Sequence, residues 1–441
     1  MAYRDFADGA LSRRGLLRGG AFLGASAALA GIPLGRQALA QAGQDLGQTW
    51  PTIRAQVLDY VNSGKVANMV ATFGWGQQDP EMIAAGTLEL ESGPAANMDT
   101  LYRIYSMTKP ITGMAAMMLI EDGKLGLDQE LATILPAFAE MRVQKEYDGS
   151  IGAENLEPAE RPITIRQLLT HTAGLGYGIV QQGPITTAYT ERGLIPGQVS
   201  RLPIPGFDRG ESVNSLEAFA DGLAGLPLVL QPGSKWSYSV GLDLMGRVIE
   251  VVSGMPFDRF LKERLFDPIG MTSTYFQVPE SEKARLATNY AVFNGSLLPI
   301  DPGDSSIYLD TPPFPTGGAG LVSSPRDYDR FLRMLTGYGT IDGRRVMGEL
   351  AVRVGTSNIL PETAQTEGTW VEGEGFGAGG RVVGSAYGWG GAAGTAALVD
   401  MRLGLRAQLF TQYMPSEAYP IQSTFGELVR QDLAAYADTA Q

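Results

Sequence analysis

The order of helix and strand patterns along the chain is the feature that most limits its fold. Mixed helix and strand patterns occupy residues 43–125, amphipathic helices and long Gly/Pro-rich loops occupy 126–310, and mixed patterns return over 311–441. A helical stretch between two mixed ones indicates an α/β (α+β) domain built from both outer segments. We therefore predict one such domain from 43–125 and 311–441, with a mainly helical domain, 126–310, inserted.

Within these stretches the residue patterns predict individual elements. The strongest helix covers 106–122, where apolar residues recur at helical spacing before Gly123, and its methionines are expected in the core. Ser324 followed by Pro325 indicates the capped start of another helix. Further helices are predicted at 46–65, 165–169, 215–223, 242–252 and 424–436, strands at 66–73 and 87–90, and a hairpin from 396–399 and 405–413.

The chain of 441 residues contains no cysteine and a single histidine, His171. Disulfides, thiol nucleophiles, iron–sulfur clusters and zinc sites with several Cys or His ligands are therefore excluded. A Ser-His-Asp triad would have to use His171. Carboxylate-only metal sites stay possible, but we expect neither a metal nor a cofactor.

The first 42 residues have the pattern of a signal peptide. Arg13-Arg14 precede a weakly apolar Ala/Gly-rich stretch, and an Ala-x-Ala sequence ends at Ala40. Paired arginines in this position resemble a twin-arginine signal, which a receptor reads and which does not anchor the protein. We predict export to the periplasm or the medium, cleavage near Ala40 or Ala42, and no stable membrane anchor. The net charge of −13 argues against a nucleic-acid partner.

Ser106-Met107-Thr108-Lys109 stands at the start of the strongest predicted helix and carries the candidate chemistry. Residues three apart share a helix face, so the hydroxyl of Ser106 and the amine of Lys109 can meet. The helix N-terminus adds free backbone N–H groups and partial positive charge beside Ser106. Burial would favour the neutral amine of Lys109, which can take the hydroxyl proton. Because many helices contain Ser-x-x-Lys by chance, the pattern alone is a weak indication.

Two further motifs follow in order, Tyr238-Ser239-Val240 ahead of a predicted helix and Trp389-Gly390-Gly391 ahead of a predicted strand. With Ser-x-x-Lys and the phrases at 168–175 and 317–324, they make residues 50–430 resemble the serine beta-lactamase and penicillin-recognising superfamily. The likeness is greatest to its class C branch and to the beta-lactamase-like carboxylesterases of family VIII. The resemblance implies a beta-lactamase/transpeptidase-like fold: an antiparallel sheet flanked by helices, an inserted mainly helical domain, and an active site between the two.

Carried over by motif, the resemblance implies catalysis through a covalent acyl-enzyme. Ser106 would be the nucleophile, Lys109 its deprotonating partner, and Tyr238 the group that passes protons to the leaving group. The backbone N–H groups of Ser106 and Ala392 would form the oxyanion hole, beside a glycine that lets the substrate approach the strand. With lysine and tyrosine in these roles, His171 is expected to be structural. Substrate contacts are expected from Tyr105, Val240, Phe376, Tyr387, Trp389, Gly390 and Gly391.

Two departures from the family pattern favour esters as substrates. Val240 stands where Asn is expected, and Trp389-Gly390-Gly391 replaces Lys-Thr-Gly. The family's polar residues bind the amide side chain and carboxylate of beta-lactams, whereas an apolar wall suits an ester; Trp-Gly-Gly also occurs in the esterase branch. We therefore expect a small-molecule ester, or an amide, as the partner. Two alternatives stay open: a beta-lactamase or D-amino-acid peptide hydrolase, and a catalytically silent binding module.

Overall fold

The computed structural model describes residues 50–202 and 211–439. The predicted signal peptide, its cleavage site and the first residues of the helix expected at 46–65 lie outside these ranges. Within them, no helix combines the length and the apolar character needed to cross a bilayer.

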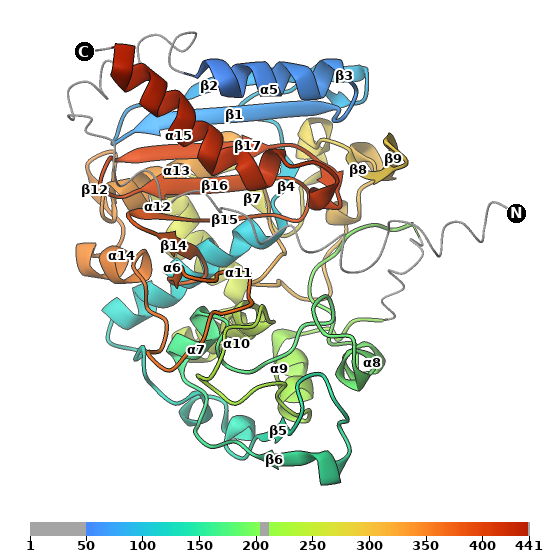
Figure 1. The fold of residues 1–441 in the computed structure, drawn as a ribbon, viewed down its shortest axis with the longest axis vertical. Helices are drawn as coiled ribbons and strands as arrows, with labels where there is room; N and C mark the ends of the chain where they lie inside the picture. Colours follow the sequence, from blue (N-terminus) through green and yellow to red (C-terminus); the bar gives the residue numbers. More distant parts are fainter. Residues whose placement is uncertain (1–49, 203–210, 440–441) are drawn as a thin grey trace, which may run out of the picture.

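An eight-stranded antiparallel sheet forms the upper part of the molecule (Figure 1). Its strand order is β13-β14-β15-β16-β17-β1-β2-β3, so β1 pairs with β17 on one side and with β2 on the other. The predicted antiparallel sheet and C-terminal hairpin are thus confirmed. The strands are β1 (Asn68–Trp75), β2 (Glu81–Glu89), β3 (Ser92–Ala95), β13 (Gly375–Phe376), β14 (Arg381–Val383), β15 (Ala386–Gly390), β16 (Ala396–Asp400) and β17 (Leu405–Phe410).

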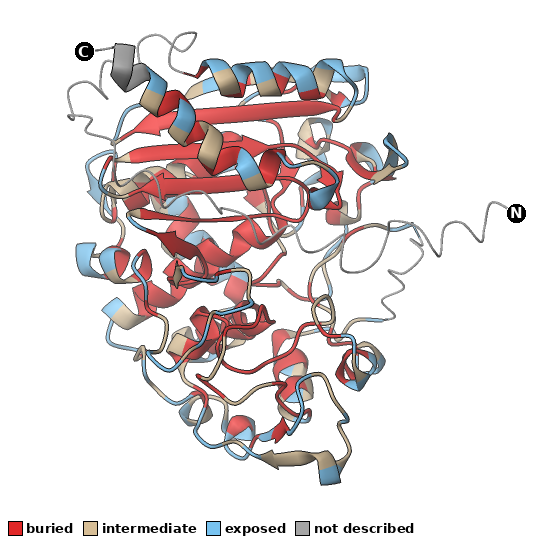
Figure 2. Ribbon diagram, viewed as in Figure 1, coloured by how far each residue is buried: buried red, intermediate tan, exposed pale blue. Residues whose placement is uncertain are grey.

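Helices cover both faces of this sheet. On one face, α5 (Pro51–Asn62) and α15 (Ile421–Thr439) pack together, and Trp50 stacks on Phe73 with ring centroids 3.9 Å apart. On the other face lies α13 (Pro325–Thr336), capped as predicted by Ser324. The strands β1 and β14 to β17 are buried, whereas β2 is only partly buried and β3 is exposed. The outer helices keep one exposed side (Figure 2). Segments from both ends of the described chain therefore build one layered unit.

Helix α6 (Thr108–Glu121) lies between the sheet and the helical part below it (Figure 1). Every residue from Thr108 to Leu119 is buried, because the helix is apolar on all sides and packs against α10, α14 and β15. The predicted helix and the core position of its methionines are confirmed. The first turn of α6 therefore lies where the two parts of the molecule meet.

The lower part is mainly helical and rich in loops (Figure 1). The helices predicted at 165–169, 215–223 and 242–252 are present as α7 (Ile165–Leu169), α9 (Leu216–Ala224) and α10 (Gly241–Ser253). The lower part also contains α8 (Pro184–Glu191), α11 (Phe257–Leu261) and the paired strands β5 (Arg142–Gln144) and β6 (Leu156–Pro158). A π-helical turn (Lys262–Phe266) leads from α11 into α12 (Asp267–Ile269), which contacts α13. The paired strands β11 (Thr340–Ile341) and β12 (Arg344–Arg345) follow α13, and α14 (Glu349–Gly355) packs against α6.

Residues 274–301 contain strands that the sequence patterns did not predict. β7 (Thr274–Tyr275) pairs with β10 (Val322–Ser323), which also pairs with β4 (Tyr102–Arg103). β8 (Asn289–Phe293), β9 (Ser296–Asp301) and β18 (Tyr413–Met414) form another small sheet. The two-residue strands β4, β7, β10 and β18 depend on distant partners more than on local alternation. β8 and β9 form a local hairpin whose Asn294-Gly295 turn sequence reasoning missed. Leu286 also forms a bridge with Leu101, so the end of the segment 126–310 pairs with both mixed segments. The domain boundaries at 125 and 310 stay a prediction.

Candidate active site

Ser106 lies in a single 3-10 turn, Tyr105–Met107, that leads directly into α6. Tyr105 has a φ of 41°, a left-handed conformation that residues other than glycine rarely adopt. Backbone strain of this kind collects at functional sites, where the surrounding structure holds it in place. The hydroxyl of Ser106 contacts two side chains, one from α6 and one from the loop before α10.

Lys109 reaches back from the first turn of α6 and is completely buried. Its Nζ donates to Oγ of Ser106 at 3.2 Å and to the carbonyl oxygen of Gly318 at 2.6 Å. The same Nζ lies 4.7 Å from the centre of the Tyr238 ring and 5.9 Å from that of Tyr177. The structure thus brings together the two groups of the Ser-x-x-Lys motif beside the rings of Tyr238 and Tyr177.

Tyr238 approaches Ser106 from the other side. Its hydroxyl donates to Oγ of Ser106 at 2.8 Å, across 132 positions of sequence, and only 2% of the residue is exposed. The loop that carries it precedes α10, whose first residue is Gly241. Oγ of Ser106 is therefore held between a phenol and an amine, both of which can exchange protons with it.

His171 lies behind Tyr238, with ring centroids 4.8 Å apart. Its Nδ1 accepts the backbone N–H of Ser239 at 3.2 Å and lies 3.0 Å from the Ser239 hydroxyl. Burial holds the pKa of His171 well below its usual value, and the charge of Lys109 lowers it further. The ring is therefore neutral and packs against Tyr238, an arrangement that suits the expected structural role.

The end of β15 lies against the segment before Ser106. A side chain at Gly391 would overlap the carbonyl oxygen of Ile104 and Oγ1 of Thr395, so only glycine fits there. Gln422 of α15 donates to the carbonyl oxygens of Gly391 at 2.6 Å and Thr395 at 2.7 Å. Sequence reasoning missed Gln422, because nothing in the pattern of α15 indicates that one glutamine reaches the turn after β15.

Backbone donors are available on both sides of this contact. Within the described ranges, neither the N–H of Ser106 nor that of Ala392 donates a hydrogen bond to another residue. Gly390, the last residue of β15, is paired with Ala396 across the hairpin. In the described part of the chain, the N–H of Ser106 and the N–H directly after Gly391 are therefore available as hydrogen-bond donors.

The other residues predicted to contact substrate are buried, and each makes different packing contacts. Val240 is fully buried at the start of α10, and Tyr387 donates its hydroxyl to the carbonyl oxygen of Ala378 at 2.6 Å. Phe376 is fully buried and lies 5.4 Å from the rings of both His171 and Trp389. The structure therefore places them in the packing around the site; as substrate contacts they stay predictions.

Aromatic rings form most of the wall around Tyr238. Trp389 of β15 lies 5.8 Å from its ring, Trp370 lies 5.1 Å away and Tyr177 5.6 Å away. Tyr177 lies in the segment between α7 and α8, and Trp370 lies in the segment between α14 and β13. The wall is therefore apolar on the side where the family pattern expects polar residues.

Asp243 is the charged residue that sequence reasoning missed. It has no exposed surface and its Oδ1 accepts the backbone N–H of Gly318 at 2.8 Å, while burial raises its pKa to about 6. In the sequence it begins a polar stripe that continues with Arg247 and Glu250, which predicts exposure. The Gly317–Gly318 loop covers it instead, and the helical pattern carries no information about that distant loop.

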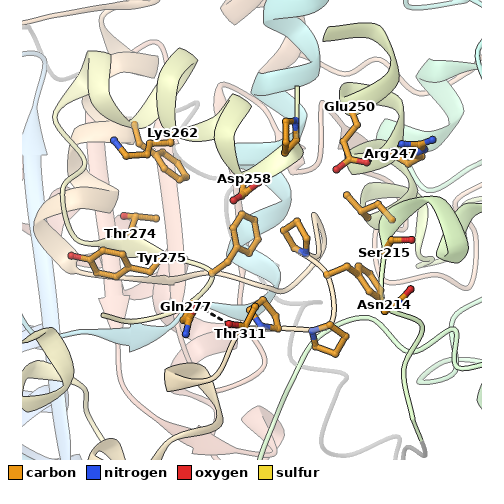
Figure 3. Close-up of a pocket in the computed structure, with 18 of the residues that line it drawn as sticks. Asn214, Ser215, Arg247, Glu250, Asp258, Lys262, Thr274, Tyr275, Gln277 and Thr311 are labelled. Carbon is orange, nitrogen blue, oxygen red and sulfur yellow. Dashed lines mark hydrogen bonds and ion pairs between the residues drawn. The ribbon is translucent and has the colours of Figure 1, made fainter. Parts of the chain in front are cut away.

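A separate cavity of about 740 Å³ opens between α9, α10, α11 and the loop Thr311–Pro315 (Figure 3). Its charged residues are largely paired with one another: Arg247 with Glu217 and Glu250, and Lys262 with Asp267. None of the residues that line it belongs to the Ser106 site. The cavity and the site are therefore distinct.

The family model described as "Beta-lactamase" matches residues 42–428 of the chain. The protein Rv1367c of Mycobacterium tuberculosis is 33% identical over 329 residues, which cover 74% of this chain and 77% of the relative. Esterase EstB of Burkholderia gladioli is 31% identical over 267 residues, 57% of this chain and 61% of EstB. The expected resemblance is confirmed.

Solved structures share the fold. EstCE1, described as a hydrolase with promiscuous acyltransferase activity, superposes with a TM-score of 0.68 at 24% identity and covers 90% of this chain and 99% of its own. The penicillin-binding protein homologue from Pyrococcus abyssi gives a TM-score of 0.62 at 21% identity, over 88% of this chain and 77% of that protein. The chain therefore belongs to the beta-lactamase family and is a serine hydrolase with the beta-lactamase/transpeptidase-like fold.

Proposed function

We propose that this protein hydrolyses carboxylic esters through a covalent acyl-enzyme on Ser106. The observation that carries the proposal is the convergence of Nζ of Lys109 and the hydroxyl of Tyr238 on Oγ of Ser106, at 3.2 and 2.8 Å. Oγ attacks the ester carbonyl while its proton passes to the Lys109–Tyr238 pair. The N–H groups of Ser106 and Ala392 stabilise the oxyanion.

Collapse of the tetrahedral intermediate releases the alcohol. Tyr238 is the group best placed to protonate the leaving oxygen, because its hydroxyl already contacts Oγ. Water then attacks the acyl carbonyl, and the same pair accepts the proton of that water. The bond from the acyl carbon to Oγ breaks, the acid leaves, and the pair returns the proton to Oγ of Ser106. The neutral His171 contributes packing to Tyr238 and no proton transfer.

Three observations support an ester rather than a beta-lactam as substrate. Val240 and Trp389 are apolar where the family pattern has polar residues. Aromatic rings surround Tyr238. Relatives include an esterase of B. gladioli and a lovastatin esterase of Penicillium rubens, the latter 33% identical over about half of each chain. We therefore place amide and beta-lactam hydrolysis second.

Acyl transfer to an alcohol is a second activity that the acyl-enzyme allows, because an alcohol can take the place of water. A monacolin J acid methylbutanoyltransferase of Aspergillus terreus is 29% identical over 55% of this chain, which supports testing alcohols as acceptors. Adding a primary alcohol during turnover of a nitrophenyl ester would show a new ester product if transfer competes with hydrolysis.

The test of the proposed function compares Ser106→Ala with the wild type on a short-chain nitrophenyl ester. We expect loss of turnover and of labelling by a fluorophosphonate probe, with the label on Ser106 in the wild type. Ser323→Ala, at a buried serine in β10, is the matched control and should keep both. Turnover by Ser106→Ala, or a label on another serine, would refute the proposal. A chromogenic cephalosporin hydrolysed faster than the ester would reverse the order of substrates.

We also propose that the protein reaches the periplasm or the medium through its twin-arginine-type signal. Arg13-Arg14 carry this proposal. Replacing both by lysine should retain the precursor in the cytoplasm, as fractionation would show; unchanged export would contradict it.

A further inference from the structure

The peptide group between Gly317 and Gly318 joins α6 to α10 beside the site. The N–H of Gly318 donates to Oδ1 of Asp243 at 2.8 Å, and the carbonyl oxygen of Gly317 accepts from Oγ1 of Thr112 at 2.7 Å. This peptide is therefore held at both ends by buried side chains. The next carbonyl along the chain, that of Gly318, accepts the amine of Lys109 at 2.6 Å.

The contact between Asp243 and Gly318 is too close for any side chain. A Cβ on Gly318 would lie 2.5 Å from Oδ2 and 2.8 Å from Oδ1 of Asp243. Oδ2 is buried and has no hydrogen-bond partner within the described residues. A buried carboxylate with one hydrogen bond is unfavourable unless an opposite charge compensates it, and Lys109 supplies such a charge, since it lowers the pKa of Asp243.

We propose that Asp243 is a positioning residue for Lys109: it fixes the Gly318 backbone so that the Gly318 carbonyl holds Nζ against Ser106, and its carboxylate is the buried counter-charge of that amine. This inference rests on the proposed function, because it assigns Lys109 a part in activating Ser106. Within the described residues, Asp243 forms no hydrogen bond with Ser106. Its effect passes through one backbone residue.

The ionisable groups around Lys109 define what a pH profile would report. They are Asp243 on α10, Tyr177 in the loop after α7, Tyr238 in the loop before α10, and His171 at the end of α7. Asp243 is the acidic side chain among them. Burial raises the pKa of Asp243 to about 6, so its carboxylate gains a proton within the range of the assay. An amide cannot take up that proton, so replacing Asp243 by asparagine should remove this step from the kcat profile and move its acidic limb to lower pH.

The test uses three variants of the full chain. Asp243→Ala removes both the acceptor and the charge, Asp243→Asn keeps an acceptor for the Gly318 N–H, and Thr112→Val releases the other end of the peptide without changing charge. Asp327→Asn is the matched control, because Asp327 is also buried and accepts a backbone N–H, that of Ser273 at 2.6 Å, but lies on α13. Ester turnover and the rate of fluorophosphonate labelling are measured per folded molecule.

We expect Asp243→Ala to lower kcat and the labelling rate by about 100-fold with little change in KM, since misplacing a catalytic group by about 1 Å has effects of this size. Asp243→Asn should keep roughly a tenth of the wild-type kcat, and the acidic limb of its pH profile should lie at lower pH. Thr112→Val should lower kcat without moving the acidic limb of the pH profile. Asp327→Asn should match the wild type. If Asp243→Ala does not fold, the turnover and labelling rates of Asp243→Asn and Thr112→Val test the inference in its place.

Two results would overturn the inference. One is Asp243→Ala labelled at the wild-type rate; the other is Asp243→Asn with a pH profile that superimposes on that of the wild type. A wild-type protein whose Ser106 takes no label would refute the proposed function instead, so the two failures are distinguishable.

Discussion

Replacing Asp243 by asparagine should stabilise the folded protein at neutral and alkaline pH. Burial raises the pKa of Asp243 to about 6 against the smaller opposing effects of Lys109 and the Gly318 N–H, whereas an aspartate in an unfolded chain titrates near 3.9. Between these values the folded protein binds a proton that the unfolded chain has lost. The free energy of unfolding therefore falls as pH rises through this window, and the full loss is present above it.

The magnitude follows from the separation of the two pKa values. About two units at about 1.4 kcal/mol per unit give about 3 kcal/mol at roughly pH 8, and almost no difference at roughly pH 4, where the aspartic acid is neutral like the amide. For a chain of this size, about 3 kcal/mol corresponds to about 4 °C in Tm. The variant is expected to be more stable and less active than the wild type, because a buried charge that serves function often costs stability.

Urea and thermal unfolding of both proteins across this pH range provide the assay. Asp99→Asn is a control of opposite sign, because Arg326 lowers the pKa of Asp99 and the pair is half exposed; it should lose under about 1 kcal/mol at neutral pH. If Asp243→Asn is instead less stable than the wild type at roughly pH 8, attraction to Lys109 outweighs desolvation, and the reasoning is refuted.

Three further substitutions test other parts of the structure. Tyr238→Phe removes one hydroxyl and should lower kcat by about 100- to 10,000-fold with little change in KM; a smaller loss in steady-state assays would remove tyrosine from the proton path. Gly391→Ala should displace the turn after β15 and lower kcat by about 100-fold, whereas Gly426→Ala, which has room for a methyl group, should be silent in the same assay. Arg406→Met breaks a buried 2.8 Å ion pair with Asp329 and should cost about 3–5 kcal/mol in urea unfolding; a loss under about 1 kcal/mol would show that the pair is dispensable.

Local patterns predicted the elements that local forces determine. The cap at Ser324, the buried α6 and the hairpin of β16 and β17 follow from capping and periodicity, and all are present. The approach of Lys109 to Ser106 follows from helical spacing alone. In contrast, Tyr238 could be linked to Ser106 only through the family resemblance, because 132 positions separate them.

The parts that could not be predicted depend on contacts between distant segments. Asp243 begins a polar stripe on α10 and becomes buried only because the loop at Gly318 covers it. Gln422 belongs to a helix that packs on the sheet, yet it binds two carbonyl groups of the turn after β15. The parallel pairing of the strand at 289–293 with the strand at 413–414 joins two distant segments. No local pattern contains these pairings. The hairpin of β8 and β9 is different, because its Asn294-Gly295 turn is a local signal that sequence reasoning missed.

The central position of β1 in the sheet sets the order in which the protein can fold. Val70 pairs with Phe410, 340 positions later, so β1 has a neighbour on only one side until β17 has been synthesised. The turn that carries Ala392 belongs to the same late segment. A growing chain therefore carries Ser106 for most of its synthesis without the strands that complete the sheet, and long-range pairing of this kind is slow. Catalytic activity can therefore appear only after the strands β15 to β17 have been translated, and the edge of β1 that will pair with β17 needs protection until then.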